Sequence, residues 1–381
     1  MRKIEMVDLV SQYQAIKTEI NQSIDEVLKS AQFIGGNAVN SFQKSFESYL
    51  NVKHVIPCAN GTDALQIAMM ALGLKPGDEV ITPSFTYIAT TEVIALLNLK
   101  PVFVDVLPDT FCIDPSKIEA AITAKTKAIV PVHLYGQAAE MEAIMKIAKK
   151  HNLFVVEDNA QAIGSDYYFS DGTKAKLGTI GDIGCTSFFP SKNLGCYGDG
   201  GAMYTNNSDL AEQLKMVANH GQKEKYKHEI VGCNSRLDGI QAAVLNVKLP
   251  LLDTYIEKRI AVADFYDKEL SKSKHVKIPF RSSISKHVFH QYTVQLSDEL
   301  NRDELQVYLQ SKQIPSMIYY PQPAHKQGMF ASFNLGDLDL PVTEDLTKRV
   351  ISFPIHTEMD EEQLTFITSE ILSFIKSKTN E

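Results

Sequence analysis

The run Thr-Ser-Phe-Phe-Pro-Ser-Lys-Asn-Leu-Gly-Cys-Tyr-Gly-Asp-Gly-Gly, residues 186–201, carries the strongest structural signal in the chain. Lys192 follows a short apolar segment and precedes a loop with glycines at 195, 198, 200 and 201. Such glycines let the backbone turn sharply and come close to a bound group. A lysine that acts as a Schiff-base nucleophile needs a partly deprotonated amine, against a free pKa of roughly 10.4, and burial can lower that pKa. Taken alone, the run fits either such a nucleophile or a strand, a turn and a surface lysine.

Upstream of this run, residues 152–158 form a short apolar segment that ends in two acids, Glu157 and Asp158. The segment is typical of a buried parallel strand. Ligands of doubly wound sheets bind at the carboxyl ends of the strands. A carboxylate at that edge can pair with the protonated ring nitrogen of a cofactor. The alternative is an acid that begins a polar loop.

A third signal lies near the start of the chain, where Gly61 and Thr62 come just before the helical pattern of residues 65–72. Backbone N–H groups at a helix N-terminus bind phosphate well, and a hydroxyl beside them adds a donor. Thr62 and Asp63 could equally be helix caps. Ser187, in the lysine run, would bring a second hydroxyl. The lysine, the acid and the phosphate site together are hard to explain by packing alone.

Seven motifs occur in order along the chain: Asn-Gly-Thr-Asp-Ala-Leu (60–65), Pro-Ser-Phe-Thr-Tyr (83–87), Glu-Asp-Asn-Ala-Gln (157–161), Ser-Phe-Phe-Pro-Ser-Lys-Asn-Leu (187–194), Gly-Asp-Gly-Gly-Ala (198–202), Asn-Ser-Arg-Leu-Asp (234–238) and Tyr-Tyr-Pro-Gln-Pro-Ala-His (319–325). The series resembles the DegT/DnrJ/StrS family of pyridoxal-phosphate-dependent nucleotide-sugar aminotransferases. This resemblance implies an α/β protein of aminotransferase fold type I. Its large domain would hold a mostly parallel sheet, and a smaller α+β domain would follow.

The resemblance also implies a role for each matching residue. Lys192 would bind the cofactor, pyridoxal 5'-phosphate (PLP), covalently and move a proton between cofactor and substrate, while Asp158 would hold the pyridine nitrogen protonated. Gln161 would lie near the phenolic oxygen of the cofactor, and Tyr87 would stack on its ring. The residues expected at the phosphate are Gly61, Thr62, Asp63 through its backbone, Ser187 and, from the neighbouring subunit, Asn234. Those expected to face the nucleotide sugar are Arg236, Tyr319, Tyr320 and His325, although the two tyrosines could instead form an amphipathic wall.

The same resemblance implies the substrates and the assembly. We expect a nucleotide-linked keto sugar that is aminated at C3 or C4 for polysaccharide or glycan biosynthesis, and an amino-acid donor, glutamate by analogy. The motifs look most similar to those of members that act on 3-keto UDP-N-acetylamino sugars. An arginine such as Arg236 suits the oxyanions of a pyrophosphate. Because Asn234 is expected to serve the neighbouring site, a homodimer with shared active sites is implied.

Three other functions are alternatives to transamination. Family members with histidine in place of Lys192 act as sugar dehydratases, so the lysine favours transamination. A nicotinamide dehydrogenase would need Gly-x-Gly-x-x-Gly after the first strand, and the chain has no such run. A catalytically idle sensor is the last alternative, and the joint presence of Lys192, Asp158 and Thr62 argues against it.

Composition agrees with a soluble enzyme. Of 381 residues, 44% are apolar and 22% charged, an ordinary globular balance, and the net charge of -8 argues against nucleic-acid binding. No apolar run has the length of a membrane span and the N-terminus lacks a signal-peptide pattern, so we expect a cytoplasmic protein without membrane association. The five cysteines form no Cys-x-x-Cys pair, and His287 and His290 have no carboxylate or cysteine nearby, so neither a disulfide framework nor a metal site is expected.

Strand and helix patterns alternate along the chain, as in a parallel α/β sheet. An opening helix is predicted for residues 11–30, strands for 79–82, 101–105, 128–132 and 291–296, and helices for 140–150 and 302–312. A mixed-charge run at 223–228 predicts a solvated loop. We expect a large PLP-binding domain at 1–249 and a small C-terminal domain at 250–381, with the boundary inside or after a long helix that begins near Leu237.

Overall fold

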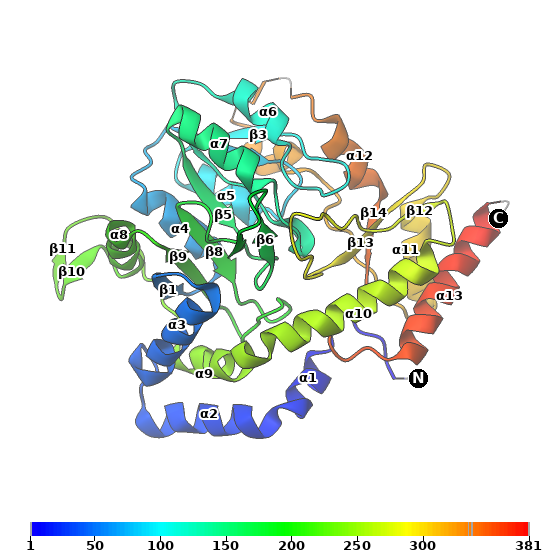
Figure 1. Cartoon of the computed structure of the whole chain (residues 1–381), viewed down its shortest axis with the longest axis horizontal. Helices are drawn as coiled ribbons and strands as arrows, with labels where there is room; N and C mark the ends of the chain where they lie inside the picture. The colour runs from blue at the N-terminus through cyan, green and yellow to red at the C-terminus, as the bar shows by residue number, and fades with distance from the viewer. Residues whose placement is uncertain (1, 334, 337, 380–381) are drawn as a thin grey trace.

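The computed structural model describes residues 2–333, 335, 336 and 338–379. A seven-stranded sheet with the order β1-β9-β8-β5-β4-β2-β3 forms the centre of the molecule (Figure 1). Its strands are β1 (His54–Cys58), β2 (Glu79–Pro83), β3 (Lys100–Val104), β4 (Thr126–Ile129), β5 (Phe154–Asp158), β8 (Ile183–Ser187) and β9 (Gly201–Thr205). The pairs from β3 to β8 are parallel, and β9 runs antiparallel to both of its neighbours. The predicted α/β class with a mostly parallel sheet is confirmed.

Helices cover both faces of this sheet. Neighbouring residues of a strand point to opposite faces, and Val80 accordingly packs in the core that α4 (Gly61–Ala71), α5 (Ala89–Leu96) and α8 (Ser208–Ala218) share. Ile81 packs in the opposite core with α7 (Met141–His151). The strands are almost entirely buried, which is why they read as continuous apolar runs rather than alternating ones.

A second, three-stranded antiparallel sheet lies beside the large one. Its order is β12-β13-β14, and a separate core of buried residues joins it to helices α10, α11 and α13. The bounds are β12 (Val276–Lys277), β13 (Tyr292–Leu296), β14 (Val350–Phe353), α10 (Leu252–Leu270), α11 (Arg302–Ser311) and α13 (Glu361–Lys378). The expected strand at 291–296 and the expected helix at 302–312 both form.

The long helix predicted from about Leu237 is interrupted. Helix α9 (Gly239–Lys248) ends in a single 3-10 turn, η3 (Leu249–Leu251), because Pro250 has no N–H for the helical ladder. In helix α10, Leu252 and Ile256 pack in a core of the large sheet, and its later residues pack in the core of the small sheet. Since α10 bridges the two cores, a boundary at residue 249 stays a prediction.

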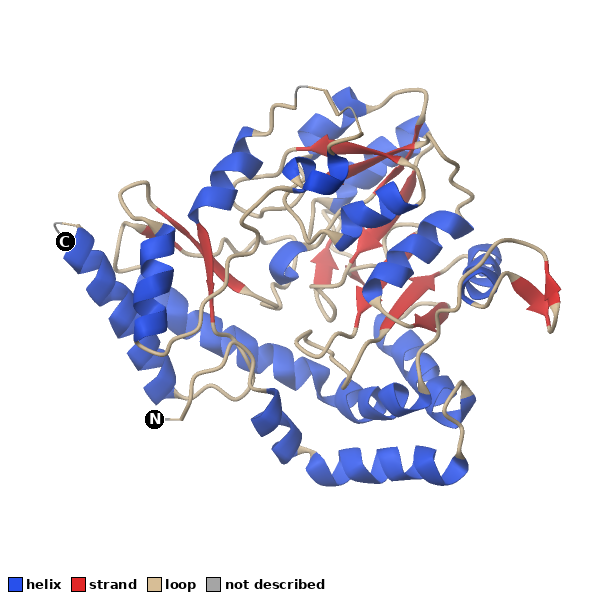
Figure 2. Cartoon of the chain, turned by 180° about the vertical axis from the view of Figure 1, so that it is seen from behind, coloured by secondary structure: helices blue, strands red, loops and turns tan. Residues whose placement is uncertain are grey.

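Two predictions on local structure were wrong. The opening helix is two helices, α1 (Leu9–Ala15) and α2 (Lys17–Ser30), because Ile16 has a non-helical backbone (φ -126°, ψ 20°). Figure 2 shows α2 along the lower edge of the molecule, where its Ser23 hydroxyl donates to the Ala243 carbonyl of α9 at 3.1 Å. The run 223–228 forms part of a short hairpin rather than a loop.

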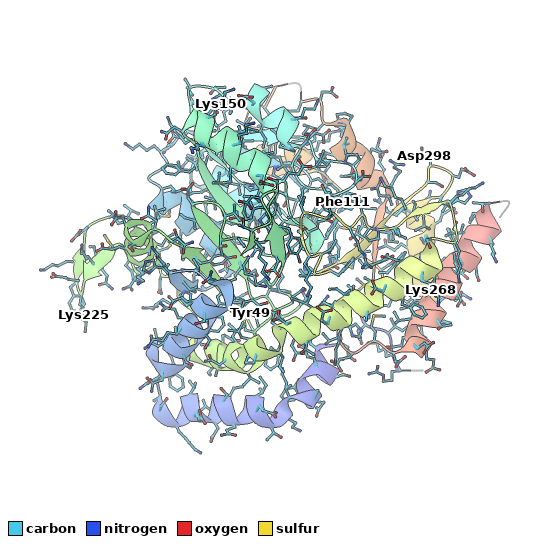
Figure 3. All side chains as sticks on the ribbon, viewed as in Figure 1. Tyr49, Phe111, Lys150, Lys225, Lys268 and Asp298 are labelled. Atoms are coloured by element: carbon cyan, nitrogen blue, oxygen red, sulfur yellow. The ribbon has the colours of Figure 1, made fainter. Side chains whose placement is uncertain are left out.

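The remaining elements connect these parts. Hairpin strands β10 (Gln222–Glu224) and β11 (Lys227–His228) project from the molecule, with Lys225 at the tip (Figure 3). The other elements are α3 (Gly36–Leu50), α6 (Pro115–Ile118), α12 (Pro341–Arg349), β6 (Asp166–Tyr168), β7 (Lys174–Lys176) and the 3-10 turns η1 (Glu119–Ala121), η2 (Leu134–Gly136), η4 (Ala324–Lys326) and η5 (Gly328–Phe330). Among the described residues, no helix is both long and apolar enough to cross a lipid bilayer.

Candidate active site

A cavity of about 560 Å³ opens at the carboxyl ends of β5 and β8. Nine of the thirteen predicted site residues line this cavity: Gly61, Thr62, Tyr87, Asp158, Gln161, Ser187, Lys192, Tyr319 and Tyr320. They come from segments far apart in the sequence. The fold therefore gathers most of the predicted site at the sheet edge where ligands of such sheets bind.

Lys192 sits in a tight turn after β8. Its backbone N–H donates to the carbonyl of Phe189 at 2.8 Å, and the side chain of Asn193 donates to the carbonyl of Val288 at 2.8 Å. A Cβ on residue 195 would lie 2.4 Å from the Pro190 carbonyl oxygen, so only glycine fits there. Burial lowers the pKa of Lys192 to about 8, although the Asp158 carboxylate opposes that shift. The amine is thus partly uncharged near neutral pH, as a nucleophile requires.

Both carboxylate oxygens of Asp158 are held by donors. Oδ1 accepts from the Ala160 N–H at 3.1 Å, and Oδ2 accepts from the hydroxyl of Thr90 at 2.7 Å. Asp158 is only 6% exposed, and the little that is exposed faces the cavity. The sequence analysis did not identify Thr90. The only feature of the sequence that points to this residue is its position three residues after the Pro-Ser-Phe-Thr-Tyr motif (83–87).

The start of α4 faces Ser187 across a very narrow gap. The cap of this helix is Asn60, whose side chain accepts from the Asp63 N–H at 2.8 Å. The N–H groups of the first helical residues, Gly61 and Thr62, have no acceptor within the helix. The Asp63 N–H already has a partner, so its expected contact with phosphate stays a prediction.

Aromatic and amide groups form the opposite wall. The Gln161 side chain donates to the Tyr320 hydroxyl at 3.0 Å and accepts from the Tyr135 N–H at 2.8 Å. The rings of Tyr87 and Tyr320 are 6.2 Å apart between centroids, at an angle of 43°. Tyr87 is 56% exposed, so its ring face is open. Burial raises the pKa of Tyr320, which therefore stays a neutral hydroxyl.

Four predicted residues lie outside the cavity: Asp63, Asn234, Arg236 and His325. Asn234 and Arg236 are exposed, while Ser235 between them is buried and accepts from the Ala59 N–H at 3.0 Å. The pair is thus fixed at the surface beside the start of α4. His325 is bonded elsewhere through one ring nitrogen: its Nδ1 lies 2.7 Å from the Ser84 hydroxyl, while its Nε2 has no hydrogen-bond partner within the described chain.

His290 is a cavity residue that the sequence analysis considered only as a metal ligand. It lines the cavity and is 6% exposed, and its Nδ1 has no hydrogen-bond partner within the described chain. Burial lowers the pKa of His290, so its imidazole is neutral. The neighbouring His287 instead stacks on Phe289, with ring centroids 3.9 Å apart. No cluster of metal-ligating side chains occurs among the described residues.

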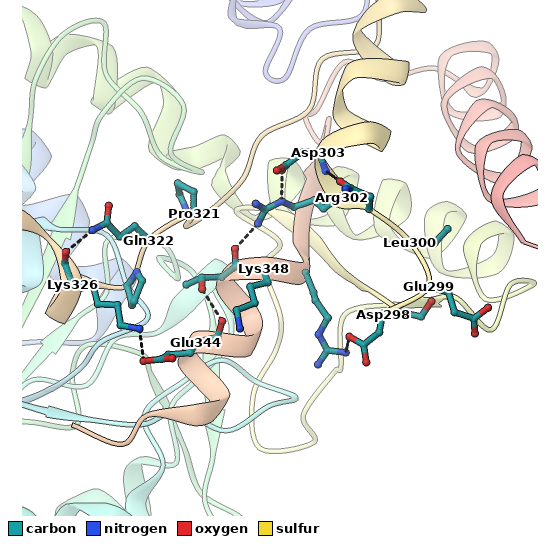
Figure 4. Close-up of a pocket in the computed structure, with 15 residues that line it drawn as sticks. Asp298, Glu299, Leu300, Arg302, Asp303, Pro321, Gln322, Lys326, Glu344 and Lys348 are labelled. Atoms are coloured by element: carbon teal, nitrogen blue, oxygen red, sulfur yellow. Dashed lines mark hydrogen bonds and ion pairs between the residues drawn. The ribbon is translucent and has the colours of Figure 1, made fainter. Parts of the chain in front are cut away.

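A larger groove of about 740 Å³ lies between α11 and α12 (Figure 4). Its charged side chains pair with one another, as Lys326 does with Glu344 at 2.6 Å and Arg302 with Asp303 at 2.9 Å. None of the predicted site residues lines it. The smaller cavity is the candidate active site, because it is lined by Asp158 and by Lys192, whose pKa is lowered.

A model described as the DegT/DnrJ/EryC1/StrS aminotransferase family matches residues 14–372. The chain belongs to this family. A relative from Geobacillus stearothermophilus, named pleiotropic regulatory protein, is 46% identical over 98% of this chain and 99% of its own length. The UDP-2-acetamido-2-deoxy-3-oxo-D-glucuronate aminotransferase of Pseudomonas aeruginosa is 44% identical over 97% and 99%.

Solved structures agree with this fold, among them one described as a DegT/DnrJ/EryC1/StrS aminotransferase. This structure, from Brucella abortus, is 41% identical, with a TM-score of 0.92 over 97% of this chain and 99% of that chain. NtdA from Bacillus subtilis, solved with bound cofactor PMP, is 34% identical, with a TM-score of 0.86 over 94% and 82%. The predicted fold type I is confirmed, and the chain is a PLP-dependent aminotransferase.

The residues present fit PLP. A Cβ on Gly61 would lie 2.7 Å from the Cβ of Ser187, so only glycine lets the start of α4 come this close to Ser187. The Ser187 hydroxyl is thereby brought beside the first N–H groups of the helix. Free N–H groups at a helix N-terminus favour a phosphate dianion. Lys192 and Asp158 line the same cavity, and the unpartnered Nδ1 of His290 leaves a polar atom for a ligand to satisfy.

Proposed function

We propose that this aminotransferase moves an amino group from an amino acid, glutamate, to a keto sugar carried by a nucleotide. The observation that carries the proposal is that Lys192, whose pKa is lowered to about 8, and Asp158 line one cavity together with the first residues of α4. When bound, PLP would supply an aldehyde that carries the amino group between the two half-reactions and a ring that acts as an electron sink. The protein supplies binding, orientation and proton transfer.

In this proposal each residue acts at a defined part of the cofactor or substrate. Lys192 would hold the cofactor through its amine and would then move a proton between cofactor and substrate. Asp158 would keep the ring nitrogen protonated. Ser187 and the start of α4, with Gly61 and Thr62, would bind the phosphate. Gln161 would contact the phenolic oxygen, and Tyr87 would cover the ring face.

For the sugar, we propose a 3-keto UDP-N-acetylamino sugar that is aminated at C3. The names of two relatives support this class: the Pseudomonas aeruginosa enzyme above, and the UDP-N-acetyl-3-dehydro-alpha-D-glucosamine 3-aminotransferase of Acidithiobacillus ferrooxidans, 43% identical over 97% of each chain. Tyr319 and Tyr320 line the same cavity and would contact the sugar. His325 does not line this cavity, so its contact with the sugar stays part of the proposal.

We further propose a cytoplasmic homodimer in which each subunit completes the other's site. The support is the exposure of Asn234 and Arg236 on a loop that Ser235 fixes in place. An isologous contact would present this loop to the partner's cavity. Asn234 would then bind the cofactor phosphate, and Arg236 the pyrophosphate of the sugar nucleotide.

Two measurements on the purified protein test the function. A visible absorbance band that borohydride abolishes would report the covalent link between PLP and Lys192. Incubation with glutamate and a panel of UDP-, dTDP- and GDP-linked 3-keto and 4-keto sugars, read by mass spectrometry, would identify the aminated product. A purely regulatory role, as the name of the Geobacillus relative suggests for that protein, predicts no product with any sugar.

A further inference from the structure

A chain of hydroxyl groups leads from the cavity to Asp158. The hydroxyl of Thr90 donates to Asp158 Oδ2 at 2.7 Å, and the hydroxyl oxygens of Thr86 and Thr90 are 3.2 Å apart. Thr90 is fully buried, and Thr86, which lines the cavity, is 4% exposed. Because both threonines lie in or next to the first turn of α5, one local segment holds both links.

The protons of this chain can be ordered in only one way. A carboxylate accepts hydrogen bonds and has none to donate, so the single proton of Thr90 must point at Asp158. Thr90 must then accept from the hydroxyl of Thr86. The donor direction of both hydroxyls is therefore fixed. Rotation of either one would leave a buried polar group without a hydrogen bond, which costs free energy.

This arrangement fixes the acid at both oxygens. The Ala160 N–H holds Oδ1 at 3.1 Å and Thr90 holds Oδ2, while the backbone of Asp158 is bonded to Pro131 and His133. Hydrogen bonds to an ionised acceptor are shorter and stronger than those between neutral groups. Without the Thr90 hydroxyl the carboxylate could turn toward other partners.

We propose that Thr90, supported by Thr86, is a positioning residue that aims the Asp158 carboxylate at the cofactor ring. The proposal rests on the proposed function, in which Asp158 pairs with the ring nitrogen. Thr90 touches neither cofactor nor substrate and acts only through the acid.

The test compares holoenzyme variants that change one group at a time. Thr90→Val keeps the shape of the side chain but removes the hydroxyl, and Thr90→Ser keeps the hydroxyl. Thr91→Val is the matched control, because Thr91 is equally buried in the same helical turn but donates to the Ile88 carbonyl at 3.0 Å. Thr90→Ala repeats the loss of the hydroxyl without steric risk, should the valine variant fail to fold.

Two readouts are measured: the visible spectrum of the bound cofactor, and the single-turnover rate with the amino donor. Thr90→Val is expected to move the spectrum toward that of Asp158→Asn and to slow the half-reaction roughly 10-fold to 100-fold, the size expected for a bond to a charged group. Thr90→Ser should retain the wild-type spectrum. Thr91→Val should retain spectrum and rate, whatever its melting temperature. In the Asp158→Asn background, Thr90→Val should change the rate by much less than it does alone.

A wild-type spectrum and rate in both Thr90→Val and Thr90→Ala would overturn the inference, as would equal changes in Thr91→Val. The inference would also be overturned if the double variant slowed by the product of the two single-variant rate reductions. Residues that act through one another have non-additive effects on the barrier. The spectrum separates this outcome from failure of the proposed function. If no keto sugar is aminated but Thr90→Val still shifts the spectrum, the proposed function is contradicted and the positioning role of Thr90 is supported.

Discussion

Gly61 and Ser187 approach so closely that a Cβ on residue 61 would lie 2.7 Å from the Cβ of Ser187. The contact brings the start of α4 against the end of β8 and forms the proposed phosphate site. We predict that Gly61→Ala weakens PLP binding at least roughly 10-fold, about 1.4 kcal/mol, because Ser187 must move. Equilibrium dialysis of the apoenzyme measures this. Gly328→Ala is the control, since a Cβ there meets nothing within 4 Å, and equal affinities of both variants would contradict the prediction.

The lowered pKa of Lys192 predicts how fast the apoenzyme captures PLP at different pH values. Only the uncharged amine reacts, so the rate of covalent capture should rise with pH and level off above a midpoint near 8. Stopped-flow absorbance from pH 6.5 to 10 measures this rate. Lys192→Ala should show no covalent capture and no half-reaction, although it can still bind free cofactor. A midpoint near that of an ordinary lysine would show that burial does not tune this amine.

Removing the charge of Asp158 should weaken the electron-sink effect of the cofactor. We predict that Asp158→Asn slows the half-reaction by at least roughly 100-fold, since each 1.36 kcal/mol of barrier is tenfold. The acid is 6% exposed and Asn has nearly the same shape, so the variant should fold and still bind PLP. Single-turnover kinetics, with PLP content measured in parallel, check this. A rate near wild type at full PLP content would remove Asp158 from the ring-partner role.

The shared site predicts complementation between inactive variants. Lys192→Ala and the double variant Asn234→Ala with Arg236→Ala should each be inactive, for different reasons. Mixed under subunit exchange, they should form heterodimers with one intact site, and activity should return toward one quarter of wild type if exchange is statistical. Two differently tagged Lys192→Ala preparations serve as the control. Proven heterodimers without activity would show that the loop at Asn234 serves its own subunit.

Lys248 is a second buried lysine, 1% exposed, and its amine donates to the Gly195 carbonyl at 2.9 Å and lies 4.3 Å from the centre of the Tyr197 ring. Burial lowers its pKa to about 8. The unfolded chain keeps the proton up to about pH 10.4, so burial of the charged amine destabilises the fold by a constant amount below about pH 8. Stability is then regained as the pH rises from about 8 toward 10.4. We predict that the free energy of unfolding of wild type, relative to Lys248→Met, rises by up to about 3 kcal/mol over that window.

Urea unfolding of the apoenzyme at pH 7.5, 8.5 and 9.5 measures the effect of Lys248. Lys192 titrates in both proteins and cancels in the difference. Lys225→Met at the hairpin tip is the control for the removal of a lysine from an exposed position. If the difference between wild type and Lys248→Met does not change with pH, the buried amine does not titrate in this range.

Local sequence predicted the elements well where one physical preference dominates. The apolar run that ends at Asp158 became β5 because a parallel strand buried on both faces needs such residues. The break at Ile16 and the pairing of residues 222–228 were not predictable in the same way. Helical periodicity continues through Ile16, and charged side chains do not reveal which backbone groups pair.

The sequence by itself determined the chemistry of the site: a lysine in a glycine-rich turn, an acid at a strand end, and a helix start able to bind phosphate. Only the tertiary structure decided which groups meet. It placed His290 in the cavity and His325 outside it, and it brought the Thr90 hydroxyl within hydrogen-bond distance of Asp158. The physical reason is that these contacts join segments up to hundreds of residues apart, and burial in a shared cavity, which lowers the pKa of Lys192, exists only once the chain has folded.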